Sequence, residues 1–150
     1  MRVVLQRVSE AAVQIDGAIH GKIGLGLLVL VGIENADTQE DIDWLAKKIS
    51  KLRIFADEDG LTNLSLLDIK GEILVISQFT LHARTKKGNR PSYIAAAPPE
   101  LAIPLYEGFK NALSHIIGRP IQAGVFGADM KVSLINDGPV TISIDSKAKA

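Results

Sequence analysis

Three hydrogen-bonding side chains, Ser77, Gln78 and Thr80, stand close together near the middle of the chain. They follow an apolar run, and ligands often bind where such a buried strand ends. A hydroxyl nucleophile would need a general base, and none stands directly beside either hydroxyl residue. The segment, which includes Phe79, therefore does not resemble the site of an ordinary serine hydrolase, and beside the basic loop that follows it suits a nucleic-acid or phosphorylated substrate. The alternative is a strand whose polar end merely reaches solvent.

A basic loop comes directly after these residues. It contains Arg84, Lys86, Lys87 and Arg90 and no acidic residue. The whole chain has 17 basic and 17 acidic residues and a formal net charge of zero, so net charge does not attract an anionic partner. A local patch would have to hold the phosphates of a nucleic acid or a phosphorylated substrate, and this loop is the candidate. A solvated loop without a partner is the alternative.

The segment 136–141, Asn-Asp-Gly-Pro-Val-Thr, is the third candidate. Asp137-Gly138 predicts a β-turn between two strands. Pro139 directly after a glycine constrains this turn and leaves a surface rich in carbonyl groups and poor in side chains. Only about 5–6% of X–Pro bonds in folded proteins are cis, so the residues alone do not predict a cis bond here.

Composition and spacing exclude several kinds of chemistry. The chain has no Cys, which excludes disulfides, thiolate catalysis and cysteine-based metal sites. His20, His82 and His115 stand far apart, so neither a metal site nor a metal cofactor is predicted. Glycine motifs for phosphates or dinucleotides and the nucleophile elbow are absent. The apolar stretches are shorter than the about 20 residues of a membrane helix and no secretory signal is present, so we expect a cytoplasmic protein.

These candidates must be positioned by a mixture of strands and helices. With 150 residues, 47% of them hydrophobic, the chain fits one α/β domain spanning residues 1–150. Apolar periodicity predicts strands at 3–8, 11–15, 27–33, 73–81, 132–136 and 140–144 and helices at 42–52 and 101–116. The order strands, helix, strands, helix, strands predicts a mixed sheet with helices on one side.

Local signals add detail to the predicted elements. Thr38 should cap the first helix, with Asp41 three residues further on. Pro104 should kink or break the second helix. Asp16-Gly17 and the segment 57–60 are predicted turns.

The strand predicted at 73–81 determines which way its polar side chains would face. Because side chains alternate along a strand, Gln78, Thr80 and His82 should share one face. Ser77 and Phe79 should then share the opposite face.

Five separated segments resemble, in order, the D-aminoacyl-tRNA deacylase family, also called D-tyrosyl-tRNA deacylases. They are 1–8 (MRVVLQRV), 63–68 (NLSLLD), 77–81 (SQFTL), 87–92 (KGNRPS) and 126–130 (FGADM) running into 136–141 (NDGPVT). The resemblance extends over essentially the whole chain. It implies β/β/α layers, a homodimer, and an enzyme without metal or cofactor that hydrolyses the ester of D-aminoacyl-tRNA. It also implies hydrolysis of glycine mischarged on tRNA.

The resemblance further implies roles for individual residues. Gly138-Pro139 matches the family's Gly-cis-Pro motif, which reaches across the dimer interface into the partner's pocket and excludes L-amino acids with its carbonyls. Arg7 matches a residue that holds this motif in place. Thr80 matches a residue proposed as the nucleophile. Alternatively, the ribose 2′-hydroxyl of the tRNA activates water, while backbone N–H groups near Gln78 and Phe79 stabilise the oxyanion.

The basic loop would then bind the phosphates of the acceptor end through Lys86, Lys87 and Arg90. Aminoacyl-tRNA and a second copy of the chain are the expected partners. Two other classes of protein remain open at this point. A non-catalytic RNA-binding module would use the same loop but would not need Gln78 or Thr80. A metal-free esterase or amidase for small D-amino-acid derivatives would not need the loop.

Overall fold

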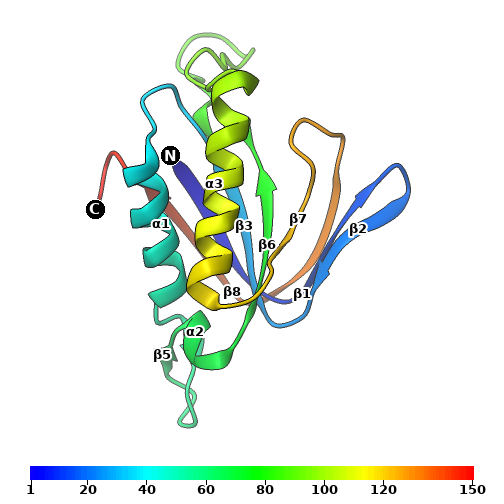
Figure 1. Cartoon of the computed structure of the whole chain (residues 1–150), viewed down its shortest axis with the longest axis vertical. Coiled ribbons are helices and arrows are strands. Elements are labelled where there is room, and N and C mark those ends of the chain that lie inside the picture. Colours follow the sequence, from blue (N-terminus) through cyan, green and yellow to red (C-terminus); the bar gives the residue numbers. More distant parts are fainter.

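A six-stranded mixed sheet carries most of the fold in the computed structural model, which describes residues 1–150 (Figure 1). Its strands are β1 (Arg2–Ile15), β2 (Ala18–Ile23), β3 (Gly26–Gly32), β6 (Glu72–Ser77), β7 (Gln122–Ala123) and β8 (Lys131–Asp145). A separate hairpin consists of β4 (Phe55–Ala56) and β5 (Thr62–Leu64). The helices are α1 (Gln39–Lys51), α2 (Leu66–Ile69) and α3 (Pro99–Ile117), and a 3₁₀ helix spans Phe79–His82.

The long strand β1 organises the sheet. Its first half pairs antiparallel with β3 and its second half with β2, while β8 runs antiparallel along nearly its whole length. The strands predicted at 3–8 and 11–15 are therefore one strand, because β8 gives both segments a continuous partner. The turn predicted at Asp16-Gly17 is confirmed and joins β1 to β2, with φ of 52° and 80°. Beyond β3 the sheet continues in parallel with β6 and β7.

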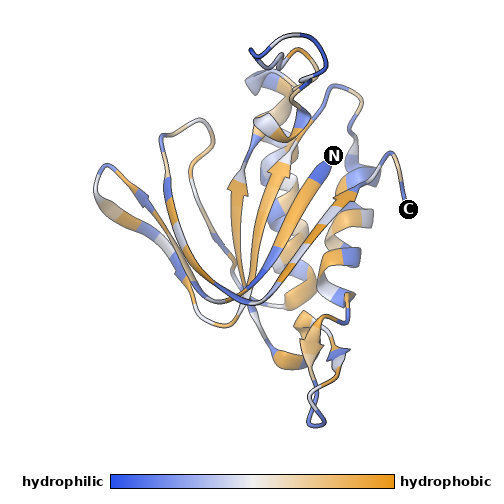
Figure 2. Ribbon diagram, turned by 180° about the vertical axis from the view of Figure 1, so that it is seen from behind, coloured by the Kyte–Doolittle hydropathy of each residue, from blue (hydrophilic) through white to orange (hydrophobic).

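Two apolar cores lie on the two faces of β3 and β6. Helices α1 and α3 lie side by side over one face, and the larger core beneath them includes Val29 and Val75 (Figure 1). The adjacent residues Leu28 and Leu74 belong to a second core on the other face. Figure 2 shows the central strands as strongly apolar. This arrangement confirms the prediction that strand 27–33 is covered on both faces.

The sheet curves so strongly that it nearly closes. Its far strand β2 returns to the edge strand β7, where His20 Nδ1 lies 2.9 Å from the carbonyl oxygen of Ala123. The second core fills the space inside this curve, and the helices cover the outside. The predicted mixed sheet with helices on one side is thus confirmed.

The two long helices follow their sequence signals with one exception. The N–H of Thr38 donates to Asp41 Oδ2 over 2.9 Å at the start of α1, as the capping prediction requires. Helix α3 runs through Pro104 as one helix, so no break occurs there. The carbonyl of Glu100 loses its partner, but both residues are exposed and water can satisfy that carbonyl. None of the helices is long and apolar enough to cross a membrane.

The strand predicted at 73–81 ends early, at Ser77. Its neighbour β3 ends at the same level, because Val31 and Ser77 are the last register pair. The N–H of Gln78 still donates to the Val31 carbonyl over 2.7 Å, and the chain then turns into the 3₁₀ helix Phe79–His82. The predicted alternation of polar side chains between two strand faces is therefore wrong. His82, the last residue of this 3₁₀ helix, is buried.

The strands predicted at 132–136 and 140–144 also form one strand, so the β-turn predicted between them is wrong. β8 pairs with β1 on both sides of residues 137–140, which have no register partner of their own, and the register shifts opposite residues 6–10. The additional residues are accommodated as an irregularity of the β-bulge type. Gly138 has a φ of 127°, a conformation that side chains disfavour. The continuous partner strand overrides the local turn signal of Asp-Gly.

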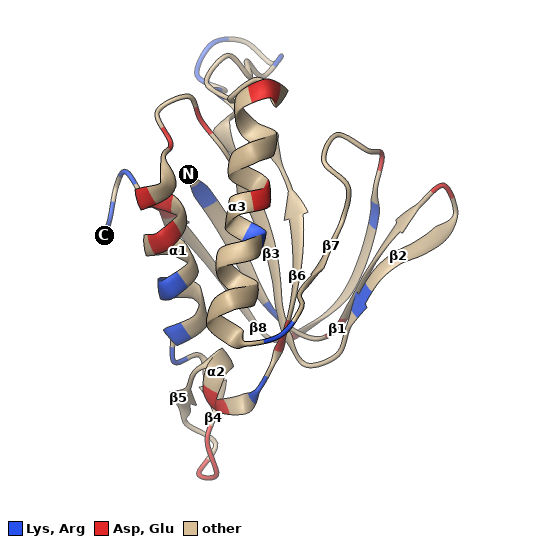
Figure 3. Cartoon of the chain, in the orientation of Figure 1, with Lys and Arg blue, Asp and Glu red and all other residues tan.

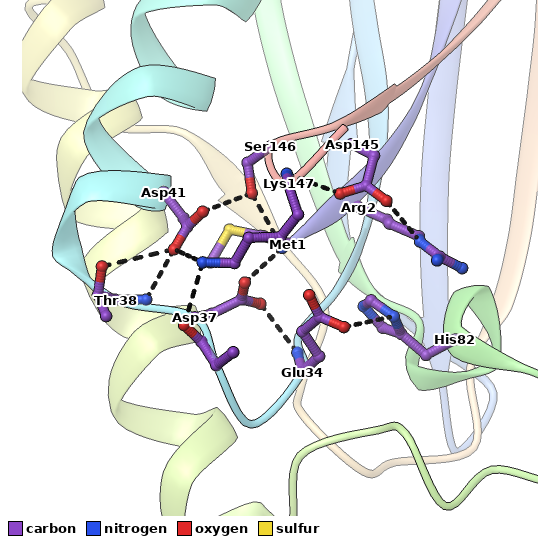
Figure 4. Close-up of polar contacts among 11 residues, drawn as sticks. Met1, Arg2, Glu34, Asp37, Thr38, Asp41, His82, Asp145, Ser146 and Lys147 are labelled. Carbon is purple, nitrogen blue, oxygen red and sulfur yellow. Dashed lines mark hydrogen bonds and ion pairs between the residues drawn. The ribbon is translucent and has the colours of Figure 1, made fainter. Parts of the chain in front are cut away.

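A polar network ties both ends of the chain to α1 (Figure 4). The buried amino group of Met1 pairs with Asp37 and donates to Ser146 Oγ over 3.0 Å. Ser146 Oγ donates to Asp41 Oδ1 over 2.6 Å, and Lys147 Nζ lies 2.9 Å from Asp41 Oδ2. Burial alone would raise the pKa of Asp41, but these hydrogen bonds and one from a backbone N–H outweigh burial and hold that pKa well below its usual range.

Replacing this carboxylate should weaken the fold and change its pH dependence. Asp41→Asn should lower the free energy of unfolding at pH 7 by about 2 kcal/mol, because it removes a charge-assisted hydrogen-bond acceptor from a buried network. The pKa of Asp41 is lower in the folded chain than the 3.8 of a free side chain. The stabilisation that the carboxylate contributes is therefore fully present above pH 3.8, and it is lost as the pH falls from there through the pKa of the folded state. Urea unfolding of the variant should therefore show a shallower loss of stability on acidification.

The exposed pair of Asp129 and Lys131, with a side-chain distance of 3.2 Å, offers a matched control. Asp129→Asn should leave both the stability and its pH slope close to wild type, because exposed pairs contribute little. An Asp41→Asn variant that keeps the wild-type acid slope would contradict the assignment of this slope to Asp41.

Candidate functional site

The carboxyl end of β6 opens into a pocket of about 260 Å³. The pocket is lined by Ile76, Ser77, Gln78, Phe79, Phe126, Gly127, Ala128, Met130 and Val132. Three of the four predicted catalytic residues are therefore brought together here, with Thr80 directly after them on the same turn. The segment 126–132 completes the lining, and residue-by-residue analysis did not identify it as part of a site. Its only signal was membership of the segments that resemble the deacylase family.

The turn packs directly on β3 because of one glycine. A Cβ on Gly32 would lie 2.9 Å from the Gln78 carbonyl oxygen and 3.1 Å from His82 Cδ2. Close packing of this kind fixes the backbone of a helix that is only four residues long.

Thr80 has a single side-chain hydrogen bond. Gln78 Nε2 donates to Thr80 Oγ1 over 2.6 Å. An amide that donates cannot take up the hydroxyl proton, so this contact does not activate Thr80 as a nucleophile. His82 does not act as the general base for Thr80 either, because its side chain is buried and its Nδ1 faces Glu34 Oε2 at 3.8 Å. The geometry therefore supplies no general base to Thr80.

The backbone of the turn offers hydrogen-bond donors instead. The first N–H groups of a helix have no acceptor within it, and here they belong to Phe79 and Thr80. The N–H of Gln78 already donates to the Val31 carbonyl. It therefore cannot also stabilise the oxyanion, the role that the family resemblance suggested for N–H groups near Gln78 and Phe79. Two adjacent N–H groups at the mouth of a pocket can stabilise a negatively charged oxygen.

The exposed aromatic ring of Phe79 connects the pocket to the segment that follows the basic loop. It contacts Tyr93 edge to face, with 5.0 Å between the ring centroids and an interplanar angle of 76°. Both rings are accessible, 52% for Phe79 and 40% for Tyr93. Accessible aromatic rings of this kind can stack on nucleic-acid bases.

The basic loop is closed at its base and open at its tip. Arg84 and Ser92 exchange two backbone hydrogen bonds of 2.8 and 3.0 Å. Between them Lys86, Lys87 and Arg90 are exposed, and none of the loop's basic side chains forms an ion pair in the structure. Figure 3 shows this blue loop above the first turn of α3. The structure therefore leaves these charges available to an anion beside the pocket.

The bond between Gly138 and Pro139 is cis, as the family resemblance predicts. Arg7 lies against it: its Nε donates to the Asp137 carbonyl over 2.9 Å and its Nη1 to the Ile54 carbonyl over 2.6 Å. A Cβ on Gly138 would lie 2.8 Å from Arg7 Nη2. The structure thus brings Arg7 to the glycine–proline pair.

The glycine–proline pair does not lie at the pocket of its own chain. Val132 lines the pocket, and neither Gly138 nor Pro139 is among the lining residues. Pairing of β8 with β1 continues from Val132 to Asn136, and these four residue steps already span about 13 Å. Both residues of the pair are exposed to solvent.

The chain is similar to deacylases over nearly its full length. The family described as D-Tyr-tRNA(Tyr) deacylase matches residues 4–145. The chain is 62% identical to a D-aminoacyl-tRNA deacylase of Parabacteroides distasonis and 64% identical to one of Bacteroides thetaiotaomicron. Each match extends over 149 residues and 99% of both chains.

Solved structures show the same fold. One described as c-Myc DNA Unwinding Element Binding Protein has a TM-score of 0.93 and 43% identity, and the match covers 99% of this chain and 100% of that one. Another, described as a probable eukaryotic D-amino acid tRNA deacylase, has a TM-score of 0.82 at 17% identity, covering 95% and 97%.

Proposed function

Because this chain belongs to the D-aminoacyl-tRNA deacylase family and is an ester hydrolase that acts on D-aminoacyl-tRNA, we propose that it cleaves the ester without a nucleophile of its own. The observation that carries this proposal is the hydrogen bond from Gln78 to Thr80, which leaves the hydroxyl without a base. Family membership sets aside both the non-catalytic RNA-binding module and the esterase for small D-amino-acid derivatives.

In the proposed reaction the substrate supplies the group that activates water. The ester carbonyl lies in the pocket, with its oxygen toward the N–H groups of Phe79 and Thr80. The neighbouring ribose 2′-hydroxyl orients a water molecule and accepts its proton as the water oxygen bonds to the carbonyl carbon. The 2′-hydroxyl passes its own proton to the ester oxygen of the ribose as the bond from that oxygen to the carbonyl carbon breaks, and the products are a free amino acid and tRNA. An ester is already activated, so positioning and oxyanion stabilisation suffice.

Selection of D-amino acids is assigned to Gly138 and Pro139 of a second copy of the chain. In a homodimer their carbonyls would enter the partner's pocket and occupy the space that an L side chain needs. The pair is exposed and is absent from the lining of its own chain's pocket, and both observations support an arrangement across two chains. Arg7, bonded beside the pair, would keep the carbonyls in place. Glycine, which lacks a side chain, would be accepted and removed from mischarged tRNA.

The tRNA acceptor end is assigned to the basic loop, through Lys86, Lys87 and Arg90. Their charges are exposed, unpaired and next to the pocket, which suits contacts with phosphates. The substrate is found in the cytoplasm, where we place the enzyme. Release of D-Tyr but not L-Tyr from tRNA by the purified protein tests the function as a whole.

Removing one loop charge should weaken tRNA binding in a salt-dependent way. Lys87→Ala should lower the affinity and make the plot of log affinity against log salt shallower by about 0.7–0.9, the change expected for one lost phosphate contact. Binding of non-hydrolysable aminoacyl-tRNA at several salt concentrations measures both quantities.

The exposed Lys22 in β2 serves as the control, and Lys22→Ala should change neither affinity nor slope. A weaker Lys87→Ala complex with an unchanged slope would contradict a phosphate contact at this lysine.

A further inference from the structure

We propose that Arg2, held by Asp145, is a positioning residue of the deacylation reaction. Its guanidinium fixes the 3₁₀ helix Phe79–His82 through the carbonyl of Leu81, over 3.1 Å from Nη1. This inference rests on the proposed function, because it concerns the backbone that would stabilise the oxyanion.

The 3₁₀ helix needs support from outside itself. It has four residues, about one turn, and helices this short are not stable alone. At its start the chain is tied to the sheet through the Gln78 N–H. At its end the last carbonyls lack partners within the helix. The Thr80 carbonyl accepts from the Ala83 N–H over 3.0 Å, and Arg2 satisfies the Leu81 carbonyl.

Arg2 is itself held in one position. It begins β1, stands opposite Asp145 of β8 in the sheet register, and donates from Nε to Asp145 Oδ2 over 2.9 Å. The second carboxylate oxygen of Asp145 accepts from the Lys147 N–H over 2.9 Å. Figure 4 shows the Arg2 side chain extending from Asp145 toward the helix that carries His82. A carboxylate fixed on one side and a carbonyl on the other define a single orientation of the guanidinium.

The two bonds use the planar geometry of arginine. Different nitrogens of one guanidinium reach the carboxylate and the carbonyl at the same time. A lysine ammonium is a single point on a flexible chain and does not reproduce this fork. Loosening the bond to Leu81 would let the turn move, and with it the N–H groups of Phe79 and Thr80. Small displacements of such donors reduce the rate of the chemical step more than they reduce binding.

Arg2→Lys should therefore lower kcat on D-tyrosyl-tRNA by about 10- to 100-fold while KM stays within about twofold of wild type. Arg2→Ala should lose at least as much, and added guanidinium ion should restore part of its kcat, because the side chain of Arg2 is 45% exposed and the vacated site is accessible. Single-turnover kinetics on purified enzyme, with melting temperatures measured in parallel, separate rate from folding.

Arg53 is a matched control, because its Nε also donates to a backbone carbonyl, that of Asn63, at 2.9 Å in the region of the β4–β5 hairpin. Arg53→Lys and Arg53→Ala should keep wild-type kcat. If Arg2→Ala does not fold, Asp145→Asn carries the test, since it loosens the guanidinium without removing it: kcat should fall with KM unchanged.

The proposal would be overturned by an unchanged kcat in Arg2→Lys or by a rise in KM alone. It would also be overturned if Arg2→Ala folds but added guanidinium ion does not restore its kcat. Wild-type enzyme in the same assay separates this outcome from failure of the proposed function. An inactive wild type would reject the proposed function, whereas an active wild type with an equally active Arg2→Lys rejects only the role of Arg2.

Discussion

D-Aminoacyl-tRNA that ends in 2′-deoxyadenosine should be hydrolysed at least about 100-fold more slowly than the ribose form, because it lacks the hydroxyl that activates water. Thr80→Ala should keep measurable turnover, within about tenfold of wild type. The reason lies in the turn: the only side-chain partner of Thr80 Oγ1 is the amide of Gln78, which donates a hydrogen bond and cannot accept the proton of a nucleophile. In the proposed mechanism the substrate therefore activates the water molecule, and the protein contributes position and backbone N–H groups.

The measurement compares each ester with its own spontaneous hydrolysis, because the two esters differ in intrinsic reactivity. The enzymatic enhancement should collapse for the deoxy substrate and survive in Thr80→Ala. Thr80→Ser, which keeps the hydroxyl and its bond to Gln78, is the control for packing effects. An inactive Thr80→Ala together with an active Thr80→Ser and an active deoxy substrate would restore Thr80 as the nucleophile.

Elements defined by local chemistry could be predicted from the sequence. The start of α1 follows from Thr38 and Asp41, whose hydrogen bond depends only on residues three apart. The burial of both faces of strand 27–33 could be predicted because its odd- and even-numbered residues are both apolar, and both faces are indeed buried. The turn at 57–60 is also confirmed, with the Gly60 N–H donating to the Asp57 carbonyl over 3.0 Å. In each case the determining contacts lie within a few residues.

Elements defined by distant partners could not be predicted in this way. The apolar residues Phe79 and Leu81 continue the pattern of the preceding strand, so hydropathy places the end of the strand too late. What ends β6 at Ser77 is the end of its neighbour β3, which no local pattern reports. The turn expected at Asp137-Gly138 fails for the same reason, because the long strand β1 keeps both halves of β8 in one ladder.

The candidate site likewise has parts that depend on neighbouring residues and parts that depend on distant segments. The turn residues and the basic loop could be identified because their chemistry is contiguous in sequence. The pocket wall from Phe126 to Val132 and the contact of Arg2 with Leu81 depend on segments that meet only in the fold. The engaged N–H of Gln78 could not be foreseen either, because its acceptor Val31 lies 47 residues away in sequence.

Discrimination between enantiomers should be the largest effect of the glycine–proline pair. The enzyme should hydrolyse D-tyrosyl-tRNA and cleave L-tyrosyl-tRNA at least about 100-fold more slowly, because the carbonyl pair that we propose to enter the pocket from a second copy of the chain would collide with an L side chain. Equal hydrolysis of both forms would contradict the proposal, as would a fully active monomer. Gly138→Ala should abolish most activity, since a side chain disfavours the φ of 127° at this position, and a Cβ there would lie 2.8 Å from Arg7 Nη2 and displace the guanidinium that is bonded to the Asp137 carbonyl. Gly60→Ala is the control, because Gly60 also has a positive φ, 79°, but has no atom within 4 Å of an added Cβ.

Glycyl-tRNA separates steric exclusion from positive recognition of a D side chain. A pocket that recognised the D side chain would have to fit many different groups, and it would reject glycine, which offers none of them. Backbone carbonyls that only fill the space of an L side chain have nothing to collide with in glycine. The enzyme should therefore hydrolyse glycyl-tRNA at a rate within about 100-fold of D-alanyl-tRNA, since one methyl group in a hydrophobic pocket is worth roughly 10- to 200-fold. Ready cleavage of the D-alanyl form with resistance of the glycyl form would show that a side chain is being read, and exclusion by Gly138 and Pro139 would then be the wrong mechanism.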